Sequence, residues 1–445
     1  MNAQSTYSGQ TTLTSGIAIP TVSSVGSVGS LTSGPFGTGA LVLAGGSLRG
    51  TTSAITVGNA VTIANDSAFP TVANEANLIL SGPITLTGNR VLTVDYGSSV
   101  IGTALVFSNA IGDGGNNYGL TKAGAGTLFL SGTNTYGGAT NVTGGVLLTA
   151  ASTALSGYNV AGRVAFNGGT IAARTGAGGW STAQIDTLLA NAVKTSGTLG
   201  IDTTTASQTQ WTAFTTTNFG PSLGLTKYGV NALTLSFANN YTGATNVLAG
   251  VLTVQNATGL GTTNAGTTVA AGARLELDGA ITVTGEALTI SGDGENFFGA
   301  LQSKNGASEW TGPITVAANG TRIGAAANSS LKVSGVISGA AANSLTFRPE
   351  DSTAAVTITG SNTYAGTTSI LGGTVSISSL NSVVGGAASS SLAHRRPRRT
   401  ASSRSADRAS KAPSFISVPE KRQIVRSISV GRPAERRSIN RVRDF

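Results

Sequence analysis

Two 30-residue segments of this chain are similar enough to predict the same local structure for both. Residues 119–148 read GLTKAGAGTLFLSGTNTYGGATNVTGGVLL, and residues 224–253 read GLTKYGVNALTLSFANNYTGATNVLAGVLT, with 18 identities in 30 ungapped positions. A looser third copy covers residues 356–373, and part of a fourth begins at residue 6. The four copies share a marker tyrosine, at Tyr7, Tyr136, Tyr241 and Tyr364. Such self-similarity is the signature of repeat folds, and it constrains the architecture before any local motif is considered.

The residues within each copy alternate with a period of two. Leu128 and Leu130 are separated by Phe129 and flanked by Thr127 and Ser131. Alternation of this kind places aliphatic side chains on one face of a half-buried strand. Gly, Asn and Ser recur every few residues, so the strands are expected to be short and the turns frequent. The 62 glycines and the abundant threonine also disfavour a helical protein, because both residue types are poor helix formers.

Short repeated strands could form a sandwich, a propeller or a solenoid. No propeller-blade signature is present, and the identical aliphatic and Asn positions of the copies favour an all-β, parallel β-helix over residues 1–392. Coils of about 20–30 residues would then stack like upon like at about 4.8 Å, giving about 13–19 coils. Asn141 and Asn246, which are equivalent in the alignment, would belong to an asparagine ladder in a turn.

One segment, residues 181–192, departs from the strand pattern. It places Ile185, Leu188, Leu189 and Ala192 at helical spacing after Ser181, a residue type that caps helix N-termini. The spacing predicts a short amphipathic helix docked on the rod. A helix that binds a partner is the alternative.

The net charge of +9 is confined to one end of the chain. Residues 395–445 hold 15 basic and 4 acidic residues, a net of +11, so the remaining 394 residues carry 12 − 14 = −2. The tail, taken as residues 393–445, has few large apolar residues and repels itself, which predicts disorder. A nucleic-acid-binding arm is an alternative for the tail, but the nearly neutral body is not expected to bind nucleic acid specifically.

The repeat string resembles the passenger-associated strand repeat of bacterial autotransporters. Residues 119–148 and 224–253 match almost the whole motif LTKxGxxxLxLSxxNxYxGATNVxxG, and residues 356–373 match its second half. The resemblance implies a right-handed β-helical passenger that a C-terminal β-barrel translocator of the parent protein exports to the cell surface. In that family the repeat is associated with secretion and stacking, not with catalysis.

Both ends of the chain depart from that family pattern. No secretory signal precedes the repeat at Thr6, and no stretch approaches the roughly 20 apolar residues of a spanning helix. After residue 392 the composition changes abruptly to arginine-rich sequence where further coils and a barrel are expected. The expectation from sequence is therefore a passenger fragment whose last ~50 codons are read out of frame, which the coding DNA can test.

The chain has few side chains that could act as a general acid or a general base. Cysteine is absent and the single histidine, His394, lies at the tail boundary, so no catalytic triad or zinc site is expected in the body. Glu276 and Asp278 share one strand face and are the best candidates for a carboxylate pair of a glycoside hydrolase, although solvated outer-face acids are the simpler interpretation. Glu350 and Asp351 read as a charged turn.

Several polar or glycine-rich features are candidates for binding sites. The turns at 112–117 and 292–296 supply oxygen ligands, but neither matches the calcium nonapeptide, and the glycines at 124–126 lack a phosphate-loop context. Lys122 and Lys227 occupy equivalent positions, and we expect solvated strand ends there. The tryptophans could be carbohydrate platforms or could pack on the rod. They are Trp180, Trp211 and Trp310.

The sequence therefore favours a non-enzymatic, surface-displayed or secreted stalk that adheres to host or cell-surface ligands and has no cofactor or metal. Two alternatives are kept open. The first is a β-helical polysaccharide lyase or hydrolase, and the second is a nucleic-acid-binding protein that acts through its basic tail.

Overall fold

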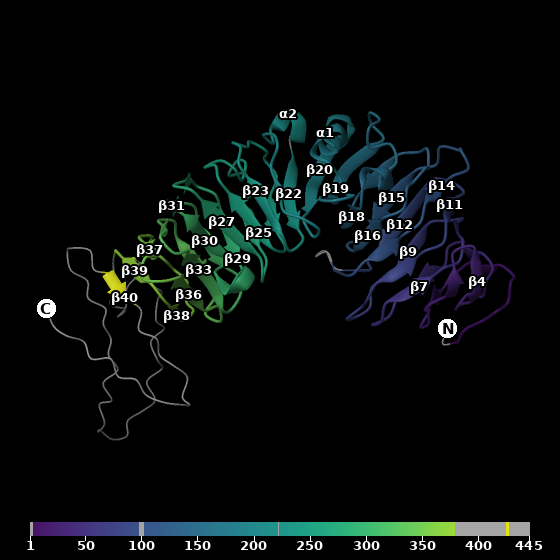
Figure 1. Cartoon of the computed structure of the whole chain (residues 1–445), viewed down its shortest axis with the longest axis horizontal. Helices are drawn as coiled ribbons and strands as arrows, with labels where there is room; N and C mark the ends of the chain where they lie inside the picture. Colours follow the sequence, from purple (N-terminus) through teal and green to yellow (C-terminus); the bar gives the residue numbers. More distant parts are fainter. Residues whose placement is uncertain (1–2, 98–101, 221, 379–423, 427–445) are drawn as a thin grey trace, which may run out of the picture.

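The chain folds into a parallel β-solenoid whose coils stack into a curved rod (Figure 1). The structure is a computed structural model, and it describes residues 3–97, 102–220, 222–378 and 424–426. Parallel partners lie 19 to 30 residues apart in sequence, as between Thr127 and Val146 or Thr11 and Leu41. These separations confirm the predicted coil length and the all-β fold class.

The largest sheet runs along most of the rod and contains 17 strands. Its strands are β7 (Ile55–Val57), β9 (Ser67–Phe69), β10 (Leu78–Leu80), β12 (Arg90–Val94), β13 (Leu105–Phe107), β15 (Leu120–Ala123), β16 (Thr127–Leu130), β17 (Thr140–Val142), β18 (Val146–Thr149), β19 (Val164–Arg174), β20 (Val193–Asp202), β22 (Leu223–Tyr228), β24 (Thr245–Val247), β26 (Thr267–Val269), β29 (Leu288–Ile290), β32 (Ile314–Val316) and β35 (Ile337–Gly339).

Two further sheets form other faces of the C-terminal half, and three smaller ones lie in the N-terminal half. The eight-stranded sheet contains β21 (Gln208–Thr209), β23 (Ala232–Leu235), β25 (Val251–Val254), β27 (Arg274–Asp278), β30 (Leu301–Asn305), β33 (Thr321–Ala325), β36 (Leu345–Pro349) and β38 (Thr368–Ile370). The six-stranded sheet contains β28 (Thr282–Val283), β31 (Ala307–Trp310), β34 (Ser330–Val333), β37 (Ala355–Ile358), β39 (Thr374–Ile377) and β40 (Ile424–Arg426). The N-terminal sheets are β1 (Thr11–Leu13), β5 (Leu41–Leu43), β8 (Val61–Ile63), β11 (Ile84–Leu86) and β14 (Ile111–Gly112); β2 (Ile17–Ala18) with β6 (Ser47–Leu48); and β3 (Val25–Ser27) with β4 (Ser30–Ser33).

The core is a set of aliphatic columns that run inside the rod parallel to its axis. One column stacks seven fully or almost fully buried residues from consecutive coils: Leu78, Leu105, Leu128, Leu147, Ile171, Leu199 and Leu225. Burying a leucine side chain contributes about 1.5–3 kcal/mol, so every coil is stabilised by the coils next to it. The expectation that like residues stack upon like is confirmed for these aliphatic positions.

The predicted helix is present as α1 (Thr182–Asn191). Ser181 is its N-cap in a capping box with Gln184, and Ile185, Leu188 and Leu189 are buried. The structure also contains a short helix that the sequence did not predict, α2 (Thr216–Phe219), and two 3₁₀ turns, η1 (Ser152–Ala154) and η2 (Glu295–Phe297). Figure 1 shows α1 and α2 side by side on the convex side of the rod, and they contact each other. No helix among the described residues has the length and apolar character required to cross a membrane.

The basic tail lies almost wholly outside the described residues. Its one described part, β40, pairs antiparallel with β39, so these three residues form a strand where disorder was expected. The predicted disorder of the remaining tail, its origin and the boundary at residue 392 stay predictions.

Candidate functional site

Three of the four repeat copies build a common site around a buried asparagine two residues before the marker tyrosine; the N-terminal copy has Ser5 at that position. Asn134 accepts a hydrogen bond from the backbone N–H of Ile111 in the preceding coil (2.8 Å) and donates one to the carbonyl of Ala154 in the following coil (2.6 Å). Asn239 repeats the arrangement with the N–H of Phe214 (2.8 Å) and the carbonyl of Gly259 (2.6 Å). Each side chain therefore joins three successive coils. We call Asn134, Asn239 and Asn362 the bridging asparagines, because Asn362 likewise accepts from the N–H of Ile337 (2.7 Å).

The marker tyrosines make one hydrogen bond in common, to a threonine four residues later. Tyr136 and Thr140 lie 2.6 Å apart through their hydroxyls, Tyr241 and Thr245 also 2.6 Å, and Tyr364 and Thr368 2.8 Å. Burial raises the pKa of Tyr136 to about 12, so this hydroxyl stays protonated at neutral pH. The pairing also occurs in the N-terminal copy, between Tyr7 and Thr11, and therefore belongs to the repeat itself.

The predicted asparagine ladder is wrong. Asn141 stands between Thr121 and Ala165, and Asn246 stands between Thr226 and Thr268, so no asparagine lies above or below either residue. Both belong to the outward-facing set of their strands, whereas the bridging asparagines are buried in the turns. The motif Asn-x-Tyr was the sequence signal for the residues that join the coils.

Lys122 and Lys227 are also not solvated, in contrast to the prediction, and are completely buried. The ammonium group of Lys227 donates to the carbonyls of Tyr228 (2.8 Å), Gly229 (2.6 Å) and Ala249 (2.9 Å). Lys122 makes equivalent bonds to the carbonyls of Ala123 and Gly124 (2.9 Å each) and Gly144 (3.1 Å), and a longer one to the carbonyl of Val94 (3.4 Å). The three shorter bonds of each lysine match the three protons of an ammonium group, so each lysine holds the turns of adjacent coils together.

Burial also perturbs these lysines electrostatically. It lowers the pKa of Lys122 to about 8 and that of Lys227 to about 7, and the nearby charges of Asp95 and Asp202 act in the opposite direction. Their inward position was readable from the sequence, because Lys122 lies two residues after the inward-facing Leu120. A lysine in the inward-facing phase of a strand therefore indicates a buried ammonium group and not the solvated strand end that we expect from the sequence.

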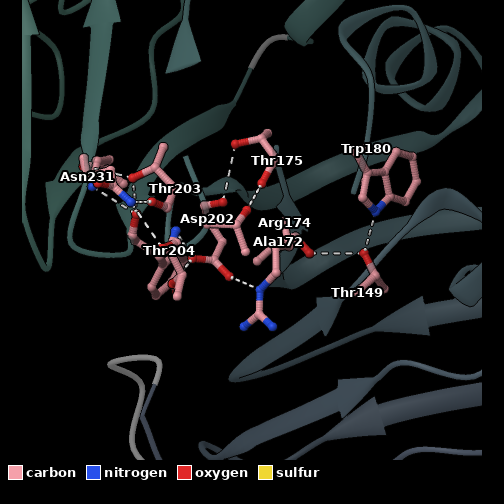
Figure 2. A network of polar contacts seen from close by, with 12 residues as sticks. Thr149, Ala172, Arg174, Thr175, Trp180, Asp202, Thr203, Thr204 and Asn231 are labelled. Atoms are coloured by element: carbon pink, nitrogen blue, oxygen red, sulfur yellow. Dashed lines mark hydrogen bonds and ion pairs between the residues drawn. The ribbon is translucent and has the colours of Figure 1, made fainter. Parts of the chain in front are cut away.

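A polar network occupies the stretch between the two full repeat copies (Figure 2). Arg174 and Asp202 form an ion pair at 2.7 Å, and the carboxylate also accepts from the backbone N–H of Thr204 at 3.0 Å. The Arg174 guanidinium lies 4.6 Å from the ring centre of Phe129, two strands away in the sheet. Asp202 is fully buried and its carboxylate is occupied by protein donors, which indicates a structural role.

The carboxylate pair proposed from the sequence lies on the outer face of β27, where Glu276 is buried and Asp278 is partly exposed. Glu276 is 5% exposed and pairs with Arg274 at 2.7 Å and Lys304 at 3.5 Å, and it accepts a hydrogen bond from Thr253 at 3.0 Å. Burial acts to raise the pKa of Asp278, but hydrogen bonds from Asn305 and Gln255 and the charge of Lys304 bring it below its ordinary value. A carboxylate held ionised in this way is poorly suited to donate a proton as a general acid.

The 3₁₀ turn η2 covers this face of β27. It overlaps residues 292–296, the second of the two turns considered above as calcium sites. Arg274 donates to the carbonyl of Glu295 (3.0 Å), and its guanidinium also lies 3.4 Å from the Glu295 carboxylate and 5.4 Å from the Phe298 ring centre. Phe297 extends outward with 62% of its surface exposed and a positive φ of 64°. The backbone and side-chain oxygens of Glu295 in this turn therefore bind Arg274.

The other suspected turn is likewise occupied by protein donors. The carboxylate of Asp113 accepts hydrogen bonds from the N–H groups of Gly115 (2.9 Å), Tyr118 (2.9 Å) and Gly137 (2.8 Å). The Gly137 bond is the main cause of a lowered pKa of Asp113. Across residues 3–97, 102–220, 222–378 and 424–426, no group of three or more Asp, Glu or His side chains is arranged to hold a metal ion.

The remaining residues singled out from the sequence do not converge on a common site. Glu350 and Asp351 lie in a turn, where Glu350 accepts from the N–H of Ala327 (3.1 Å) and Asp351 from that of Thr353 (2.8 Å). The tryptophans pack against the rod and do not present open platforms. Trp180 and Trp310 are buried, and the partly buried Trp211 donates to Asp186 of α1 at 2.8 Å.

A groove lies on the outer face of the six-stranded sheet, near the C-terminal end of the described rod. It has a volume of about 590 Å³ and is lined by side chains of β28, β31, β34, β37 and β39. One row of outward-facing residues crosses all five strands. The row contains Thr282, Glu309, Lys332, Thr357 and Ser376. This groove is a candidate for ligand binding that the sequence analysis did not identify, since its residues come from five different coils.

Replacing Glu276 with glutamine tests whether the carboxylate pair is structural. We expect a loss of about 1–3 kcal/mol in unfolding free energy, because Arg274 and Lys304 lose a buried counter-charge. Chemical denaturation followed by circular dichroism measures the change. The exposed Glu350→Gln variant is the matched control and should unfold like the wild type; equal effects of the two substitutions would contradict a structural role for Glu276.

Comparison with known proteins identifies the repeats. A family model described as passenger-associated-transport-repeat matches residues 120–148, 225–254 and 353–377. The chain is 30% identical over 291 residues to the adhesin BmaC autotransporter of Brucella suis biovar 1 (strain 1330), a match that covers 57% of this chain and 8% of that relative. The chain thus matches only a small part of the relative's length. No solved structure matches the chain.

Proposed function

We propose that the chain is part of an autotransporter passenger and acts as a non-enzymatic, surface-displayed stalk with adhesive faces, because it contains three passenger-associated repeats and is similar to an autotransporter adhesin. The observation that carries the proposal is the bridging of successive coils by the same buried asparagine in three repeat copies. Bonds of this kind resist the separation of coils, which is the property that a rod projecting from a cell requires.

Three carboxylates that could take part in acid–base chemistry are instead engaged in holding the fold. Glu276 is ion-paired, Asp202 is buried against Arg174, and Asp113 is saturated by backbone donors. The relative is named an adhesin, and adhesion is the role that we carry over to this chain. Its partners in the parent protein would be a C-terminal β-barrel translocator and ligands on host or neighbouring cells.

The test is to display the chain on bacteria through a fused β-barrel translocator. We expect cells that carry the chain to adhere to host-cell monolayers several-fold better than cells that carry the translocator alone. Protease accessibility of intact cells verifies that both proteins reach the surface. Equal adherence of the two strains, with both proteins accessible to protease on intact cells, would refute the adhesive role.

A further inference from the structure

The groove on the six-stranded sheet is elongated along the axis of the rod. Thr282 pairs with Glu309, Glu309 with Lys332, Lys332 with Thr357, and Thr357 with Ser376, each on the next strand of the sheet. Four strand intervals of about 4.8 Å span about 19 Å. A ligand that fills this groove is therefore long and narrow and lies across the strands.

The groove presents hydroxyl groups that no other side chain uses. Within the described residues, the hydroxyls of Thr282, Ser330, Thr357 and Ser376 take part in no side-chain hydrogen bond, although all four residues line the groove. A hydroxyl can both donate and accept a hydrogen bond. A row of such groups complements a ligand that is itself rich in hydroxyls.

The charge of the groove is balanced. Its two charged side chains, Glu309 and Lys332, pair with each other at 3.0 Å, and Ser334 donates a further hydrogen bond of 2.6 Å to Glu309. A strongly anionic ligand, such as a nucleic acid or a sulfated polymer, would find no excess positive charge there. A neutral ligand fits the charge of this surface better.

The paired backbones of the strands in this groove favour a polysaccharide ligand over a peptide. Peptides that add to sheets bind an exposed strand edge through backbone hydrogen bonds. In this groove the backbones of β31, β34 and β37 are already paired on both sides, so only side chains are available. Recognition must then proceed through hydroxyls and the ion pair.

We propose that this groove binds a neutral, linear polysaccharide whose chain lies along the rod axis. Sugar hydroxyls would exchange hydrogen bonds with the threonine and serine row, and the Glu309–Lys332 pair would supply one acceptor and one donor of greater strength. The proposal rests on the adhesive function proposed above and names the ligand class for one face of the stalk.

Affinity gel electrophoresis of the full chain tests the proposal with three defined neutral probes, namely dextran, galactomannan and hydroxyethyl cellulose, and with alginate as the anionic comparison. We expect at least one neutral probe to retard the wild type. The double variant Thr282→Val/Thr357→Val removes two groove hydroxyls while keeping the β-branched shape, and it should weaken binding by about tenfold. The matched control, Thr268→Val/Thr289→Val, changes two outward threonines of the large sheet and should bind like the wild type.

Each result of the electrophoresis assay either supports or overturns the proposed polysaccharide site. Retardation by a neutral probe that is lost in the groove variant and kept in the control supports the site. No retardation by any neutral probe, equal retardation of both variants, or binding to alginate alone would overturn it. Because the adherence assay with displayed chain does not depend on these probes, adherence that persists despite such a result would leave the adhesive stalk standing and remove only its proposed ligand.

Discussion

Replacing the bridging asparagine Asn239 with alanine is expected to destabilise the chain by about 3 kcal/mol. The substitution leaves the N–H of Phe214 and the carbonyl of Gly259 without their partner inside the rod, and each unpaired buried group costs about 1–3 kcal/mol. The loss should appear as a lower denaturant midpoint in guanidinium unfolding followed by circular dichroism, and as faster proteolysis between the coils that Asn239 joins.

Asn246 provides the control for this experiment within the same repeat. It is the same residue type seven positions later, but it faces outward and makes no side-chain hydrogen bond among the described residues. Asn246→Ala should therefore leave the midpoint nearly unchanged. If the two alanine variants unfold at the same denaturant concentration, asparagine bridging does not stabilise the stack.

Replacing the buried Lys227 with methionine is expected to change how stability depends on pH. Burial lowers the pKa of Lys227 to about 7 in the folded chain, whereas an unfolded lysine titrates near 10.4. Between these values the unfolded chain binds more protons than the folded chain, so wild-type stability should rise with pH, by at most about 1.4 kcal/mol per pH unit. The rise should be absent below about pH 7, where both states carry the charge.

Lys227→Met keeps the length of the side chain and removes both the charge and the three bonds to carbonyl groups. Denaturant unfolding of both proteins between pH 6 and 10.5 gives their stability difference as a function of pH. That difference should move in favour of the wild type as the pH rises. Lys332→Met, at a side chain that is 48% exposed, should show no such trend. A difference between wild type and Lys227→Met that stays constant or shrinks with pH would contradict the perturbed titration.

The architecture could be predicted from the sequence because each coil repeats the same local signals. Period-two alternation identified the strands, and the spacing of Ile185, Leu188 and Leu189 identified α1 almost to the residue. The solenoid then followed from the match between residues 119–148 and 224–253. These features depend on residues that are close to one another in sequence, so a single sequence is enough to predict them.

The polar contacts could not be predicted in the same way, because their partners lie one coil away. Asn239 finds its acceptor 20 residues later, and Lys227 reaches Ala249 after 22 residues. Glu276 was expected to be solvated because nothing in its own strand indicates that η2 folds over that face. The groove shows the same limit, since Glu309 and Lys332 become neighbours only when the coils stack.

The central claim, that bridged coils form a mechanically continuous stalk, is tested most directly by pulling single molecules from both ends. The account predicts a stepwise extension, with each step releasing one coil of 19 to 30 residues and adding about 65–105 Å of contour length. The coils that contain the bridging asparagines Asn134 and Asn239 should yield last and at the highest force. Extension at negligible force, or one release of the whole rod without steps, would contradict the claim.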